Sequence, residues 1–240
     1  MSDWLKTYQD KTEYLSEPYD FNIYFKEKEI NGRAVSLLEI GEVNVPTGEV
    51  FVCDPLTFLT RDQKPYFLKT PIGKFPLTIV VVEVEENHHR YVGFRVKFSD
   101  KEAISYKLAL KGDEDLASME MGEFFGFNVD AGLATFVDVK TRDAFCDFEE
   151  KWHRENSEAS NIYDDFFAAL FAKNARNNPK FQREYGDWIL FQIPDTELSV
   201  PMIQSGFGDG TYPAYFGFDS QGAICELFVE FIDATLPEEE

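Results

Sequence analysis

The chain has 240 residues, 44% of them hydrophobic and 16% aromatic, so it can bury a core without metal or disulfide support. This composition excludes an intrinsically disordered protein. The 44 acidic and 23 basic residues give a formal net charge of -21. Because such a surface repels phosphate backbones, nucleic-acid binding is excluded and a basic protein partner is favoured. The negative charge is also explained by a role in solubility alone, without a basic partner, and this alternative stays open.

The cysteines indicate a reducing environment. Cys53, Cys146 and Cys225 are far apart, and no Cys-x-x-Cys or Cys/His spacing is typical of a zinc site. We therefore expect reduced, buried thiols, a cytoplasmic protein, and no metal or other cofactor. Residues 1–14 are charged throughout, and no apolar stretch is long enough to cross a bilayer, so we expect neither a secretory signal nor membrane association.

The N-terminal half is predicted to be mostly β-structure. Apolar residues recur at helical spacing within residues 1–18, which predicts a short amphipathic helix. Residues 21–52 alternate between apolar and polar runs separated by turns, which predicts strands. Residues 77–84 and 91–98 predict a hairpin. The continuous apolar run at 79–82 predicts a strand buried on both faces.

The C-terminal half adds helices to this pattern. Aromatic residues at three- and four-residue intervals predict a helical pair at 141–177. Further strands are predicted at 104–110, 124–129, 133–139, 188–193, 214–218 and 223–232. We therefore predict an α+β fold, predominantly antiparallel sheet in a sandwich or in strongly curved sheets, with the helical pair inserted. The expected division is an N-terminal helix at 1–18 and a single β-rich domain at 19–236, with a frayed charged tail at 237–240.

Two glycine-containing segments stand between apolar runs. Residues 205–212 hold three glycines and Asp209, and Asp130 is followed by Ala131 and Gly132. Glycine is used where the backbone takes positive φ or approaches another group closely. These segments therefore specify backbone shape more than side-chain chemistry.

Four motifs occur in a fixed order. They are VPTG at 45–48 leading to Cys53, Asp54 and Pro55; PIGKFP at 71–76 before a valine-rich strand; GEFFGFNVDAG at 122–132; and SGFGDGTY at 205–212, followed by a turn at 219–222 and an apolar strand. Together they resemble the bacterial domain-of-unknown-function 4241 family over roughly residues 40–232. The resemblance implies a β-rich bacterial fold and no particular activity, since none is established for the family.

The aspartates at turns and strand ends pose the question of an enzyme. Carboxylates of Asp54, Asp130, Asp138, Asp209 and Asp219, if brought together, can hold a hard cation or share a proton. Aspartate beside glycine is equally typical of a tight turn. The glycine-rich segment lacks the patterns of a phosphate loop, a calcium loop and a nucleophile elbow. Asp130 and Asp209 remain the catalytic candidates.

Aromatic residues flank both glycine-containing segments. Rings next to carboxylates can bind Lys or Arg side chains of a partner, although each ring can also belong to the core. The candidate partner- or ligand-binding residues are Phe127, Asp130, Phe207, Asp209 and Tyr212. We therefore predict a non-enzymatic cytoplasmic interaction protein of the immunity type, which masks a basic bacterial toxin. The alternative is a hydrolase-like enzyme, or a small-ligand- or metal-binding module, that uses Asp130 and Asp209.

Overall fold

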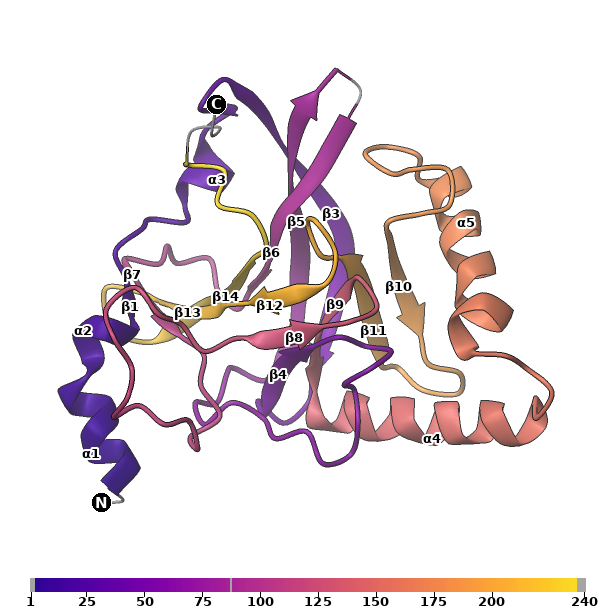
Figure 1. Ribbon diagram of the computed structural model, residues 1–240, viewed down its shortest axis with the longest axis horizontal. Helices are drawn as coiled ribbons and strands as arrows, with labels where there is room; N and C mark the ends of the chain where they lie inside the picture. Colours follow the sequence, from indigo (N-terminus) through magenta and orange to yellow (C-terminus); the bar gives the residue numbers. More distant parts are fainter. Residues whose placement is uncertain (1–2, 87, 237–240) are drawn as a thin grey trace.

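The computed structural model describes residues 3–86 and 88–236 (Figure 1), so the charged tail at 237–240 lies outside the described residues. Its main element is an eight-stranded antiparallel sheet with the order β1-β7-β13-β14-β6-β5-β3-β2. The strands are β1 (Ser16–Glu17), β2 (Glu29–Ile30), β3 (Arg33–Val45), β5 (Gly73–Glu85), β6 (His88–Lys97), β7 (Ser105–Leu108), β13 (Ala214–Phe218) and β14 (Ile224–Glu230).

A smaller sheet and a ribbon complete the β-structure. The smaller sheet has the order β10-β11-β9-β4, and strands β12 and β8 form a separate antiparallel ribbon. These strands are β4 (Val50–Cys53), β8 (Phe127–Val129), β9 (Leu133–Asp138), β10 (Trp188–Gln192), β11 (Ser199–Gln204) and β12 (Gly210–Tyr212).

The helices lie at two ends of the molecule (Figure 1). The N-terminal helix is divided into α1 (Asp3–Asp10) and α2 (Thr12–Leu15), and α3 (Ile23–Lys26) follows β1. The helical pair is α4 (Val139–Glu155) and α5 (Ala168–Asn177), with a π-helical turn (Tyr163–Phe167) leading into α5. The predicted α+β class, with antiparallel sheets, a helical pair and a short N-terminal helix, is confirmed.

Each face of the large sheet carries its own core. Along β5, Ile79 and Val81 belong to a core shared with the smaller sheet, the ribbon and the helical pair. Val80 and Val82 belong to a second core, covered by residues from the N-terminal segment. All four side chains are at most 1% exposed, which confirms that this strand is buried on both faces. The predicted hairpin is confirmed as β5 and β6.

Four segments differ from the sequence prediction. Residues 16–17, within the range predicted as the N-terminal helix, form strand β1 and pair with β7. Residues 23–26 form α3 rather than a strand, because the Asp20 carboxylate accepts from the backbone N–H of Asn22 and turns the chain there. Strands β11 and β12 were not predicted. Pro201 lies within β11, where proline usually argues against a strand, but pairing with β9 covers only Ile203 and Gln204, so Pro201 lies outside that ladder.

Cys53, Cys146 and Cys225 are free and buried, as expected. Within the described residues, no helix combines the length and apolar composition that crossing a membrane requires.

Candidate binding site

The β8–β12 ribbon joins the two glycine-containing segments. Tyr212 pairs with Phe127, and Gly210 pairs with Val129, so the two ends of the ribbon are fixed by backbone pairing. Gly126 precedes β8 at a position where a Cβ atom would lie 2.5 Å from the Tyr212 carbonyl oxygen. Glycine is therefore required for the two chains to approach this closely.

The glycine-rich segment folds into a turn held by its own polar groups. The Ser205 hydroxyl donates to the Gly208 carbonyl at 2.8 Å, and the Tyr212 hydroxyl donates to the same carbonyl at 2.7 Å. Asp209 Oδ1 accepts from the Gly132 backbone N–H at 3.0 Å. Asp209 thus connects the turn to the Asp130 segment across the ribbon.

The other aspartates at turns accept hydrogen bonds from backbone N–H groups. The buried Asp54 carboxylate accepts from the backbone N–H groups of four residues, Leu56, Thr57, Asp130 and Ala131. Asp138, also buried, accepts from Lys140 N–H at the start of α4 and from the segment at 47–48. Asp219 closes its own turn and accepts from Lys101 at 2.7 Å. These carboxylates stabilise loops at the strand ends.

The five predicted binding residues lie on the ribbon and in the turns that adjoin it. Phe127 is buried, Tyr212 is half-buried, and their ring centroids are 6.2 Å apart. Asp130 and Asp209 are both exposed at the opposite end. Phe207 is 73% exposed, with its ring centroid 5.6 Å from the Arg90 guanidinium. Among residues 3–86 and 88–236, no three His, Cys, Asp or Glu side chains are grouped closely enough to hold a metal ion.

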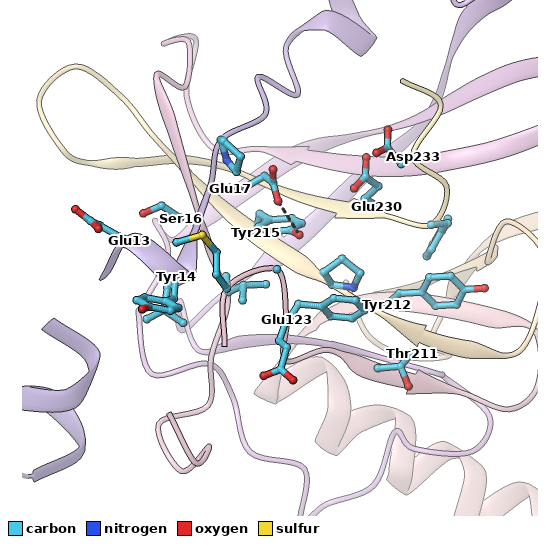
Figure 2. Close-up of a pocket in the computed structure, with 18 residues that line it drawn as sticks. Glu13, Tyr14, Ser16, Glu17, Glu123, Thr211, Tyr212, Tyr215, Glu230 and Asp233 are labelled. Carbon is cyan, nitrogen blue, oxygen red and sulfur yellow. Dashed lines mark hydrogen bonds between the residues drawn. The ribbon is translucent and has the colours of Figure 1, made fainter. Parts of the chain in front are cut away.

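A cavity of about 690 Å³ opens beside the ribbon at the Tyr212 end (Figure 2). Its walls come from the N-terminal segment at 13–18, the loop at 121–124, the segment at 211–215, and the end of β14 with the residues after it. We call this cavity the acidic pocket, because five carboxylates line it and none of its eighteen lining residues is basic. The five are Glu13, Glu17, Glu123, Glu230 and Asp233.

Tyrosine hydroxyls orient two of these carboxylates. Tyr215 donates to Glu17 Oε2 at 3.3 Å, the contact drawn in Figure 2, and Tyr24 donates to Glu230 Oε1 at 3.0 Å. Tyr24 is itself fixed, since its hydroxyl accepts from the Ala234 backbone N–H at 3.2 Å. Glu17 and Glu230 are thus held on different strands of the large sheet, β1 and β14.

Glu230 is the most perturbed acid of the acidic pocket. Burial raises the pKa of Glu230 to about 8, and the nearby carboxylates of Asp233 and Glu17 act in the same direction. The hydrogen bond from Tyr24 opposes this shift because it favours the charged form. Glu230 is therefore largely protonated near neutral pH when nothing else is bound.

Aromatic rings form much of the remaining wall. Tyr14, Phe124, Tyr212, Tyr215 and Phe231 line the acidic pocket, and Figure 2 shows the Tyr14 and Tyr212 side chains on different sides of it. At its mouth Met121 is 76% exposed. Such a combination of carboxylates and ring faces suits an organic cation.

The Tyr14 ring already contacts one cation. The ammonium group of Lys11 lies 4.4 Å from the Tyr14 ring centroid and donates to the Met119 carbonyl at 2.8 Å. This lysine is held by the loop and does not line the acidic pocket.

Of the five candidate binding residues chosen from the sequence, only Tyr212 lines this pocket. The five carboxylates come from segments far apart in the chain, and each is an ordinary acidic residue within its own segment. The negative net charge was the only signal that pointed toward them.

The comparison with known families bears on the same segments. Residues 43–229 match the model of the family described as protein of unknown function (DUF4241). The chain belongs to this family. The match covers the ribbon and most of the large sheet of this DUF4241 protein, whereas Glu13, Glu17, Glu230 and Asp233 lie outside the matched range. No curated protein and no solved structure matches the chain.

Proposed function

We propose that this DUF4241 protein is an interaction protein that binds a basic protein partner at the acidic pocket. The observation that carries the proposal is a cavity of about 690 Å³ with five carboxylates, aromatic walls and no basic lining residue. Lys and Arg side chains are the natural complement of such a site, because carboxylates supply charge and rings supply cation–π contacts.

The charge of the whole chain supports the same partner. A net charge of -21 attracts a basic protein at long range and accelerates its encounter with the pocket. An immunity-type role, in which the protein masks a basic toxin in the cytoplasm, is the form of this function that we propose.

Charge reversal at the mouth of the pocket tests the proposal. We expect a tagged wild-type protein to recover a basic protein from its native host, and the double variant Glu13→Lys/Glu123→Lys to lose it. Glu155→Lys/Glu158→Lys is the matched control, because both residues are exposed, at the end of α4 and in the loop after it, and neither lines the pocket. The recovered protein should inhibit growth when expressed alone, and co-expression of the wild-type chain should restore growth.

Two results would contradict this function. One is equal recovery by the pocket variant and the wild-type protein. The other is binding that does not weaken as salt is raised, because exposed charges are screened within about 10 Å at 0.1 M ionic strength.

The alternative proposal is a hydrolase-like enzyme or a ligand-binding module that uses Asp130 and Asp209. It is supported by their exposed positions at one end of the ribbon. Asp130→Asn and Asp209→Asn separate the two proposals, because an asparagine Oδ1 at 209 can still accept from Gly132 N–H. If the interaction function is right, both variants bind the partner as the wild-type protein does; an enzyme would lose its turnover.

A further inference from the structure

Resting on the proposed function, we propose that the Glu230 end of the acidic pocket holds one basic side chain of the partner. The cationic group of that lysine or arginine lies against Glu17, Glu230 and Asp233, and its aliphatic stem lies along the tyrosine rings. We call these three residues the Glu230 group. They lie together in the upper part of Figure 2.

The Glu230 group has unused capacity to accept hydrogen bonds. Glu17 accepts from the Tyr215 hydroxyl and from the Tyr19 backbone N–H, and Glu230 accepts from the Tyr24 hydroxyl. One oxygen of Asp233 accepts from the backbone N–H and the hydroxyl of Thr235. Because an ionised carboxylate has about four lone-pair sites, each member of the group can accept further hydrogen bonds. Within the described part of the chain, no salt bridge involves any member of the group, although many surface carboxylates elsewhere have a Lys or Arg partner. A cationic side chain from outside would complete these contacts.

The shape of the acidic pocket suits a side chain that carries its charge at the tip. Tyr215 lies next to Glu17, and Tyr212 lies farther out on the ribbon. A ring beside a methylene stem contributes apolar contact, while the charged tip reaches the carboxylates. The cavity is within the range of roughly 300–1,000 Å³ typical of specific pockets, so residues next to the basic one can also enter.

Binding of the cation is coupled to a proton. The groups that face Glu230 are Tyr24 from α3, Tyr215 from β13, Glu17 from β1, and Asp233 just after β14. None of these supplies positive charge. When a cation is held there, the ionised form of Glu230 is favoured and its proton leaves to solvent near neutral pH.

A decalysine peptide tests whether the Glu230 group binds a lysine side chain in the intact protein. Its binding is measured by titration calorimetry near pH 7 in two buffers with different ionisation enthalpies. We expect the wild-type protein to release a fraction of a proton to buffer on binding, up to about one. Glu230→Gln removes that release and weakens binding about tenfold, the size expected for one charge-assisted contact.

Further variants keep the test decisive. Glu17→Gln, on a different strand, weakens binding but retains proton release, because Glu230 is still present. Glu158→Gln, outside the pocket, retains both affinity and release. Heats of binding that are the same in both buffers for the wild-type protein would contradict binding of the cation at the Glu230 group. Equal weakening of decalysine binding by Glu158→Gln and Glu230→Gln would contradict it as well.

Failure of cation binding at the Glu230 group and failure of the proposed function are distinguishable. If a basic partner is captured from the host but Glu230→Gln changes neither its affinity nor proton release, the function stands and binding at the Glu230 group is wrong. If decalysine binds with Glu230-dependent proton release but the host yields no basic partner, binding at the Glu230 group stands and the protein-masking function is wrong.

Discussion

Glu230 shows how one buried acid links the core to the candidate site. Its carboxyl accepts from Tyr24, whose hydroxyl also binds the backbone after β14, so the group lies between the second core and the acidic pocket. Burial and neighbouring carboxylates keep it protonated to about pH 8. The folded state therefore binds a proton that the unfolded chain releases in mildly acidic solution.

This linkage predicts a pH dependence of stability with a defined sign. The folded pKa of Glu230, about 8, is above its ordinary value of 4.5, so its stabilising contribution is complete below pH 4.5 and is lost as pH rises toward 8. Relative to Glu230→Gln, the wild-type free energy of unfolding should fall by about 1.4 kcal/mol per pH unit across this window. Urea unfolding of both proteins at several pH values measures it; parallel profiles would show that Glu230 is not protonated in the fold.

Asp54 illustrates the structural use of a turn aspartate. Its buried carboxylate holds four backbone N–H groups, two of them in the Asp130 segment. Asp54→Ala leaves these donors unsatisfied and should lower the free energy of unfolding by about 3 kcal/mol or more. Asp130→Ala, at an exposed position, should change it by only about 0.5 kcal/mol. Similar losses in the two variants, measured by denaturant unfolding, would contradict the assigned roles.

At the scale of elements, the β8–β12 ribbon depends on one close backbone contact. An alanine at Gly126 would place its Cβ 2.5 Å from the Tyr212 carbonyl oxygen, whereas one at Gly210 would meet nothing nearer than 3.4 Å. Gly126→Ala should therefore cost about 1–3 kcal/mol and expose the amides of β12 to exchange. Gly210→Ala is the control on the same ribbon. Unchanged amide protection in Gly126→Ala would show that the ribbon is not held by this contact.

The elements were predictable where local pattern and tertiary role agree. The run at 79–82 indicates burial on both faces because it is apolar at every position, and the structure buries it so. Strand β11 was missed because Pro201 is unfavourable for a strand, and only the limited pairing with β9 makes it acceptable. Strand β12 was missed because glycine favours turns, and its pairing with β8 is long-range.

The acidic pocket was not predictable for a different reason. Its carboxylates are brought together by the sheet order β1-β7-β13-β14, which places Glu17 near Tyr215 and Glu230. Nothing within a single segment encodes that order. Of the candidate residues chosen from the sequence, Tyr212 lines the pocket, whereas Asp130 and Asp209 lie at the other end of the ribbon.

At the scale of the molecule, the large sheet separates two tasks. One face packs against the smaller sheet and the helical pair, which builds the main core. The other face is covered by the N-terminal segment, which also supplies Glu13 and Glu17 to the acidic pocket. The net charge of -21 surrounds the pocket with a field that attracts cations.

Carbodiimide cross-linking of the protein to its basic partner tests the binding of a cation at the acidic pocket most directly, because the reagent joins a lysine amine to a carboxylate without a spacer. Mass spectrometry then identifies which of the 44 acidic residues has reacted. We expect the cross-links at Glu13, Glu17, Glu123, Glu230 and Asp233, and their loss in the Glu13→Lys/Glu123→Lys variant. Cross-links concentrated on carboxylates of α4 or of the loop that contains Glu158 would place the partner elsewhere and contradict the proposed site.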